Sequence, residues 1–297
     1  MLVPEGSLKW DILRTTSSTF NFTSGDWQAN FASQNNMLFR GHTLVWHEAL
    51  PAWFPQTANG QNAERILREH ITTVVGHYAG KMHSWDVVNE VIASWYGLPN
   101  GMRPSPWLTF LGESYIDTAF RAAAAADPDA LLVFNMNHLE YNSQGVKNMR
   151  VDTLKCLRRL KDANVPVHAL GIQAHLDPND GSFNAGEFRI FLQDVAGLGL
   201  KIMITELDVT DQSLPGDITV RDLTVAGMYE EFLSVALENP NVIAVLTWGL
   251  SDKYTWLSTY KARKDNAAVR PLPLDENFNR KLAWNAIART FDKAPRR

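Results

Sequence analysis

The chain has 297 residues, of which 45% are hydrophobic and 20% are charged, so it is long enough for one large α/β barrel or for two smaller domains. A formal charge of −4 at pH 7 gives no electrostatic basis for a nucleic acid or an anionic membrane as a partner. The single cysteine, Cys156, excludes an intramolecular disulfide. No apolar run reaches the roughly 18 residues of a membrane span, and residues 1–4 show no signal peptide in this sequence.

Short apolar runs rich in β-branched residues alternate with helical patterns along the chain. We predict strands at residues 40–46, 83–91, 130–136, 169–176, 201–209 and 242–250. We predict helices at residues 26–34, 62–78, 113–126, 146–163, 187–198, 219–238 and 280–291. This alternation predicts one parallel α/β domain over residues 1–297. A doubly wound nucleotide-binding sheet is disfavoured because no G-x-G-x-x-G or P-loop motif follows a strand.

The number of strands points to an incomplete barrel. The six strands and a stub at residues 2–4 give seven, so an eight-stranded barrel needs one more β/α unit, which we expect to precede Met1. Without that unit the barrel has two open edges, at the stub and at residues 242–250. The last helix, with Trp284, Ile287 and Phe291 on one stripe, would lose a neighbour. We hypothesise a truncated or wrongly started reading frame, or self-association across the gap.

Polar and aromatic residues gather at the C-terminal ends of the predicted strands. Residues two apart on a strand share a face, and in a barrel the C-terminal ends of all strands form one active face. A carboxylate at the end of a buried strand is costly unless it is paired or used. The residues concerned are His42, Trp46, Asn89, Glu90, Gln173, His175, Glu206, Asp208 and Trp248.

Two glutamates with aromatic and hydrogen-bonding neighbours meet the requirements of glycoside hydrolysis. One carboxylic acid protonates the leaving oxygen, and the other carboxylate attacks or activates water. The acid needs a pKa raised towards about 6 while the second group must stay ionised, so the two need different environments. We hypothesise that His175 holds Glu206 ionised and that Asp208 orients His175.

Other catalytic chemistries find less support in the sequence. His42 and His47 are five residues apart on a strand and therefore point to opposite faces, and no H-E-x-x-H or Cys/His ligand spacing occurs. We therefore expect no metal site and no cofactor. A nucleophilic serine is disfavoured because the chain has no G-x-S-x-G elbow.

Several longer motifs in register carry a family resemblance. They are R-G-H-T-L-V-W-H (40–47), W-D-V-V-N-E (85–90), G-I-Q-A-H-L (171–176), I-T-E-L-D-V (204–209) and T-W-G-L-S-D-K-Y-T-W (247–256). In this order the chain resembles the endo-β-1,4-xylanases of glycoside hydrolase family 10, over nearly its whole length. The resemblance implies a TIM (β/α)8-type barrel, here without its first β/α unit, that binds xylan or xylo-oligosaccharides.

The same resemblance implies a role for each matching residue. Glu90 would be the acid/base and Glu206 the nucleophile of a retaining double displacement, which predicts carboxyl groups about 5–5.5 Å apart. Asn89 would bind the 2-hydroxyl of the sugar at subsite −1. The remaining matches are His42, Trp46, Gln173 and His175 beside that sugar, Trp248 and Trp256 as its walls, and His47, Asn135 and Asp208 in supporting positions.

Two motifs depart from the family pattern. P-E-N-E-M-K-W reads P-E-G-S-L-K-W at residues 4–10; Glu5 and Lys9 match positions that bind the −2 sugar, but Gly6 replaces the asparagine, so we expect weaker binding there. N-D-Y-N after the fifth strand reads N-M-N-H at residues 135–138, and only Asn135 matches. Because this loop borders the acid/base and the +1 side, the resemblance leaves the pKa of the acid and the binding of the leaving group open.

The leading interpretation is retaining endo-hydrolysis of xylan, and three alternatives stay open. The same mechanism could act on another β-glycan or on short xylo-oligosaccharides. The chain could be a glycan-binding barrel with little catalysis, which measurable turnover that depends on Glu206 would rule out. A metal-dependent hydrolase is a distant alternative that chelators would test. Polymeric xylan does not cross membranes, so we expect an extracellular site of action.

Overall fold

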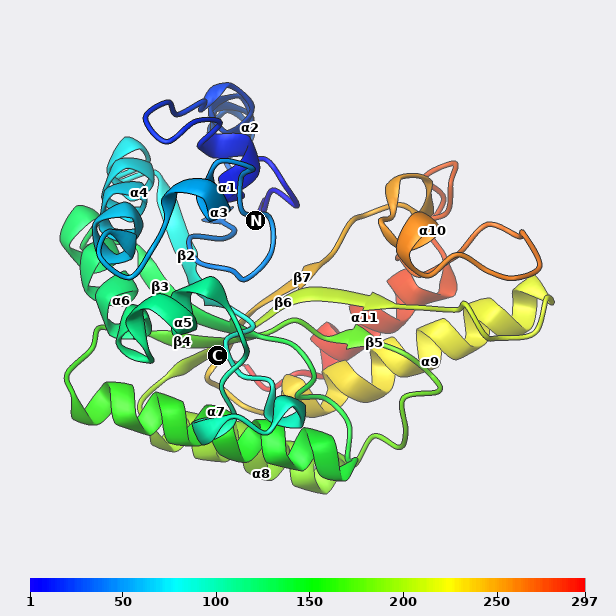
Figure 1. Ribbon diagram of the computed structural model, residues 1–297. Helices are drawn as coiled ribbons and strands as arrows, with labels where there is room; N and C mark the ends of the chain where they lie inside the picture. The colour runs from blue at the N-terminus through cyan, green and yellow to red at the C-terminus, as the bar shows by residue number, and fades with distance from the viewer. Residues whose placement is uncertain (297) are drawn as a thin grey trace. The chain divides into compact units, whose positions relative to one another are not determined.

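The computed structural model describes residues 1–296 and divides into two compact units (Figure 1). The first unit comprises residues 1–136 and 151–171, and the second comprises residues 137–150 and those from 172 onward. Each unit contains parallel strands covered by helices. No helix among residues 1–296 is both long and apolar enough to cross a membrane.

Parallel strands form the centre of the first unit. They are β1 (Phe39–Gly41), β2 (Met82–Asn89), β3 (Leu131–Met136) and the first three residues of β4 (Ala169–Ile172). β1 pairs with β2 and β2 with β3, and the amide of His168 donates to the carbonyl of Leu132 at 2.9 Å, which brings the start of β4 alongside β3. Leu2 forms a single parallel bridge with Phe39, so the predicted stub is present as one residue pair.

Helices of the first unit pack on its strands. The helices are α1 (Trp10–Leu13), α2 (Thr23–Gln34), α3 (Phe54–Thr57), α4 (Ala63–His77), α5 (Pro106–Leu111), α6 (Ser114–Ala126) and the greater part of α7 (Gln144–Asp162). α4 packs against α6, and α6 contacts β2 and β3. The apolar positions of α4, among them Ile66, Ile71 and Val74, recur at helical spacing and are buried. α6 ends before Asp127, whose extended backbone precedes a proline that could not continue the helix.

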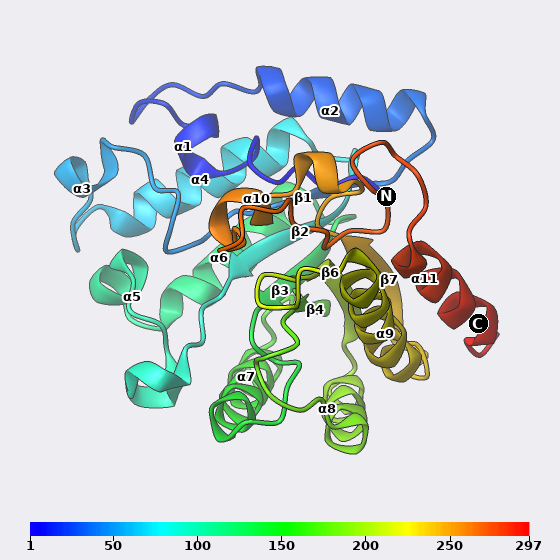
Figure 2. The same cartoon turned by 90° about the vertical axis from the view of Figure 1, so that its right-hand side faces the viewer.

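The second unit has the same kind of construction. Its strands are β5 (His175–Leu176), β6 (Lys201–Val209) and β7 (Val242–Thr247), and its helices are α8 (Ala185–Gly197), α9 (Ile218–Ala236), α10 (Leu257–Tyr260) and α11 (Leu282–Lys293). β6 pairs in parallel with β5 and with β7. α9 begins after Asp217, whose carboxylate accepts from the amides of Thr219 and Val220 and so caps the helix. α9 and α11 pack side by side (Figure 2).

Three of the predicted strands are wrong in extent. The prediction of 40–46 is reduced to β1, because residues beyond Gly41 leave the regular ladder, although Leu44 and Val45 still bond to the backbone of β2. The prediction of 169–176 is split into β4 and β5, because Ala174 has a positive φ of 62° and its amide donates to Glu140. The prediction of 242–250 ends at Thr247, shortly before Gly249 at φ 105°.

The edge of β7 and the outer face of α11 are partly exposed. α11 turns its small residues inward, with Ala283, Ala286 and Thr290 buried, and leaves Phe291 49% exposed. Within the second unit β7 pairs with β6 alone among the described residues, and its Ile243 is 39% exposed. A groove of about 350 Å³ lies here, lined by Leu237, Val242, Ile243, Phe291, Asp292 and residues 294–296 among others. In the described part of the second unit, β7 therefore has one partner strand and α11 keeps a large apolar residue exposed on its outer face.

Candidate active site

Asp86, in the middle of β2, contacts two charged or titratable side chains from β1 and the residue that follows it. The carboxylate of Asp86 pairs with the guanidinium of Arg40 and lies 2.9 Å from Nδ1 of His42, from which it accepts when that nitrogen carries the proton. All three side chains are buried. A buried ion pair of this kind is costly unless its members are fully bonded, so it fixes the orientation of His42 at the end of β1.

Glu90 follows β2 directly and is bound to both neighbouring asparagines. Its amide donates to the carbonyl of Asn135 at 2.9 Å. The side chain of Asn135 donates to Asn89 at 2.9 Å, and the side chain of Asn89 donates to Oε1 of Glu90 at 3.3 Å. Glu90 adopts a positive φ of 56°, a left-handed conformation that costs energy for a side chain with Cβ and that surrounding bonds must maintain.

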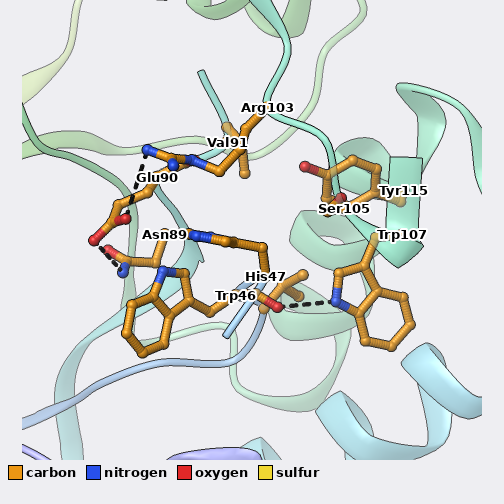
Figure 3. Close-up of a pocket in the computed structure, with 10 residues that line it drawn as sticks. Trp46, His47, Asn89, Glu90, Val91, Arg103, Ser105, Trp107 and Tyr115 are labelled. Atoms are coloured by element: carbon orange, nitrogen blue, oxygen red, sulfur yellow. Dashed lines mark hydrogen bonds and ion pairs between the residues drawn. The ribbon is translucent and has the colours of Figure 1, made fainter. Parts of the chain in front are cut away.

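Arg103 and His47 lie beside the Glu90 carboxylate (Figure 3). Nη2 of Arg103 is 3.7 Å from Oε2 of Glu90, and Nε of Arg103 donates to the backbone carbonyl of Glu90. Burial and the charge of Arg103 lower the pKa of His47, although Glu90 and Glu48 oppose this shift. The lining residues enclose only about 10 Å³, so the carboxylate is closely packed on this side.

Residues predicted to bind the −2 sugar also lie in the first unit. The ammonium of Lys9 sits 4.7 Å from the centroid of the Trp46 ring, a cation–π contact that ties the two predicted substrate-binding residues together. Glu5 is exposed. A Cβ added at Gly6 would meet nothing within 4 Å, so the glycine is not required by packing and a longer side chain would fit.

Glu206 is central to a bonded array in the second unit. It lies within β6, is 4% exposed, and its amide donates to the carbonyl of Gln173 at 3.0 Å. Nε2 of His175 is 3.4 Å from Oε2 of Glu206, and Nδ1 is 2.8 Å from Oδ1 of Asp208. The indole of Trp256 donates to the other oxygen of Asp208 at 2.8 Å. The contacts of His175 with Glu206 and Asp208 that were predicted from the sequence are therefore present.

The protonation of His175 follows from these contacts. Burial alone would lower the pKa of His175, but the carboxylates of Asp208 and Glu206 outweigh burial and the pKa lies well above its ordinary value. At neutral pH the ring is therefore a cation that donates from both nitrogens. A cationic donor at a carboxylate favours its ionised form, which is the form a nucleophile needs.

Aromatic rings surround this array. The ring centroid of His175 lies 5.1 Å from that of Trp256 and 6.4 Å, edge to face, from that of Trp248. Trp248 is buried, and Trp256 stacks on the exposed Tyr260 at 4.7 Å. Aromatic faces of this kind form platforms for sugar rings.

The predicted site residues thus fall into two groups, one in each unit. The first unit holds Glu5, Lys9, His42, Trp46, His47, Asn89, Glu90 and Asn135, and the second holds Gln173, His175, Glu206, Asp208, Trp248 and Trp256. Sequence reasoning missed Arg40, Asp86, Arg103 and Tyr260. Asp86 carried a signal, because it is a carboxylate inside a buried strand, whereas nothing local connects Arg103 to Glu90.

Comparisons with known proteins agree along the whole chain. A family model described as glycosyl hydrolase family 10 matches residues 1–290. Endo-1,4-beta-xylanase B of Thermotoga neapolitana is 32% identical over 294 residues, covering 99% of this chain and 81% of the relative. Endo-1,4-beta-xylanase 3 of Hypocrea jecorina is 34% identical over 287 residues, covering 96% and 74%. Exoglucanase XynX of Acetivibrio thermocellus is 34% identical over 304 residues, covering 97% and 26%.

Solved structures give the same result. Native xylanase 10B of Thermotoga maritima matches with a TM-score of 0.88 at 34% identity, covering 98% of this chain and 86% of that one. Xylanase 10B of Thermotoga petrophila in complex with xylobiose matches with a TM-score of 0.88 at 34% identity, covering 98% and 85%.

Proposed function

The chain belongs to glycosyl hydrolase family 10, and from this premise we propose that it hydrolyses β-1,4-xylosidic bonds within xylan with retention of configuration. The family assignment confirms the predicted glycoside hydrolase and the predicted (β/α)8-type barrel class. We propose further that residues 1–297 act as one catalytic domain, since the family match spans both compact units.

The proposed reaction has two steps on two glutamates. In the first, Glu206 attacks the anomeric carbon of the −1 sugar while Glu90 gives its proton to the leaving oxygen, so the glycosidic bond breaks and a glycosyl-enzyme ester forms. In the second, Glu90 takes a proton from water, the water oxygen attacks the anomeric carbon, and Glu206 leaves. Asn89 binds the 2-hydroxyl of the sugar, and each step inverts the anomeric centre, so the product retains the β configuration.

One observation carries the proposal: the cationic His175 lies 3.4 Å from Glu206. It supplies the environment that keeps a buried carboxylate ionised and available to attack. Reducing-sugar release from xylan by the wild type, and its loss in Glu206→Ala, tests the proposal. Turnover that persists in Glu206→Ala, or that chelators abolish in the wild type, would refute it; binding of xylan without turnover would indicate a glycan-binding barrel.

A second candidate substrate has two specific observations in its favour. A relative that matches nearly the whole chain is named an exoglucanase, and Gly6 removes a side chain from the predicted −2 position. The same mechanism would then act on another β-glycan or on short xylo-oligosaccharides. Product analysis on xylan, mixed-linkage glucan and aryl glycosides distinguishes these substrates. Faster turnover of the glucan than of xylan would favour the second candidate.

The size of the substrate bears on where the protein acts. Polymeric xylan is not taken across membranes, so we propose an extracellular site of action with xylan or xylo-oligosaccharides as the only partners of the site. Activity assays on culture supernatant and on cell extract of the source organism test this proposal. Activity confined to the extract would contradict it.

We also propose that a second copy of the chain covers the open edge of β7. Strand edges with unpaired backbone groups and exposed apolar side chains pair with other chains unless they are covered. The edge carries Ile243 and lies beside Phe291, both more than one third exposed, along a groove of about 350 Å³. Light scattering is expected to give a dimer or higher species. A folded, soluble monomer at all concentrations would refute self-association.

A further inference from the structure

Arg103 is placed firmly with respect to Glu90 by the loop that joins them. Its backbone amide donates to the carbonyl of Val91 at 2.8 Å, and Ile92 and Met102 form an antiparallel bridge in the same loop. The two ends of the loop are therefore paired to each other. The position of Arg103 depends on this short pairing and not on a mobile loop tip.

The guanidinium of Arg103 contacts both the backbone carbonyl and the carboxylate of Glu90, and Figure 3 shows the second of these contacts. Nε donates to the backbone carbonyl of Glu90, and Nη2 lies 3.7 Å from carboxylate Oε2. Nη2 is buried and has no hydrogen-bond partner among residues 1–296. Arg103 is 8% exposed, and a buried cation is retained only where other groups compensate for the loss of hydration.

The 3.7 Å separation matters for the chemistry. Direct bidentate bonds between arginine and a carboxylate favour the charged carboxylate and fix it against the cation. Nη2 of Arg103 lies 3.7 Å from Oε2 of Glu90, too far for such a bond. The donor that is aligned for a hydrogen bond, Nε, donates to the backbone carbonyl of Glu90 instead. Arg103 can therefore hold the left-handed backbone of Glu90 in place without binding both carboxyl oxygens.

The ring of Trp95 makes a second contact with the guanidinium. The carbon of the guanidinium lies 5.3 Å from the centroid of the Trp95 ring, within the range of a cation–π contact. Trp95 itself is 52% exposed. Trp95 and Glu90 thus contact Arg103 from two directions.

We propose that Arg103 is a positioning residue for proton donation: it holds Glu90 in the conformation from which the carboxyl group reaches the leaving oxygen. This inference rests on the proposed role of Glu90 as the acid. If Arg103 acts only through the acid, its loss lowers kcat/KM most for substrates whose leaving group must be protonated. A sugar leaving group needs full protonation, whereas 2,4-dinitrophenolate needs little.

The test compares kcat/KM on xylotetraose and on 2,4-dinitrophenyl β-xylobioside. Arg103→Ala is expected to lose about 100-fold on xylotetraose and less than about 3-fold on the aryl glycoside, since a positioned general acid contributes about 10²–10⁴-fold. Arg103→Lys keeps a charge but not the planar fork, and is expected to show a smaller loss with the same selectivity. Arg121→Ala is the matched control, because Arg121 also donates to backbone carbonyls, those of Ala163 and Asn164, but is exposed.

The outcomes distinguish a failure of the positioning role of Arg103 from a failure of Glu90 as the acid. Equal losses on both substrates, or no loss, in a folded Arg103 variant would overturn the positioning role. If Arg103→Ala does not fold, Arg103→Lys is judged by the same ratio. Glu90→Gln should show the selective loss more strongly. A selective loss in Glu90→Gln without one in the Arg103 variants refutes only this inference, whereas equal losses in Glu90→Gln refute the proposed acid itself.

Discussion

The charge of Asp208 is predicted to set the pH at which Glu206 loses its cationic partner. Asp208→Asn keeps an oxygen acceptor but removes the carboxylate charge, which is the strongest of the influences that raise the pKa of His175. An opposite charge at hydrogen-bonding distance shifts a pKa by about 1–3 pH units. His175 in the variant should therefore become neutral at a lower pH than in the wild type.

The sign of the effect follows from the raised pKa. A histidine with a raised folded-state pKa contributes stability that is fully present below its unfolded pKa of about 6.5 and is lost as pH rises through the folded value. In the wild type this stability declines from about pH 6.5 and is lost completely only above the raised pKa of His175. In Asp208→Asn the alkaline limb of kcat, and the loss of thermal stability that accompanies it, are expected about 1–3 pH units lower.

The assay is a pH profile of kcat on 2,4-dinitrophenyl β-xylobioside, whose leaving group needs little protonation, so that the titration of Glu90 does not set the alkaline limb. Melting temperatures are measured over the same pH range. Trp256→Phe is the matched control, because it removes the other contact of Asp208 and keeps the carboxylate. Its alkaline limb should stay at the wild-type pH even if kcat falls. An alkaline limb of Asp208→Asn at the wild-type pH would refute the account of His175.

Two further predictions concern the −2 position and the open edge. Gly6→Asn, for which the structure has room, is expected to lower KM for xylotetraose about 2- to 10-fold, the effect of one added hydrogen bond. No change in KM, or an equal change on an aryl β-xyloside that cannot fill the −2 position, would contradict this prediction. Ile243→Lys places a charge on the exposed edge of β7 and is expected to reduce self-association in light scattering. Ile190→Lys, on the exposed face of α8, is its control, and equal effects of the two lysines would contradict a role of that edge.

Sequence patterns predicted the uniformly buried elements well. The strand at 201–209 was predicted with its observed bounds, because eight of its nine residues are buried and both ends are marked by turns. The seven helices that were predicted match observed helices within about three residues at each end, whereas the short helices α1, α3, α5 and α10 were not predicted. Periodicity also placed Trp284, Ile287 and Phe291 on one stripe of α11, but it did not show that α11 would turn Ala283 and Ala286 towards its neighbours.

The parts that could not be predicted depend on contacts distant in sequence. The break in 169–176 arises at Ala174, whose left-handed backbone is compensated by a bond to Glu140, and an alanine gives no local sign of such a conformation. Arg103 was missed for the same reason, since its relation to Glu90 arises only when the loop pairs with itself. Carboxylates at the ends of buried strands identified Glu90 and Glu206, the family motifs implied their separate roles, and the structure added the side chains that contact them.

The central claim is that Glu206 is the nucleophile of a retaining hydrolase. Incubation with 2,4-dinitrophenyl 2-deoxy-2-fluoro-β-xylobioside, followed by proteolysis and mass spectrometry, tests it most directly because the fluorine slows breakdown of the glycosyl-enzyme ester. We predict inactivation with one fluoroxylobiosyl group on the peptide that contains Glu206, and β-configured product first in NMR spectra of substrate turnover. A label on another residue, or α-configured product first, would contradict the account.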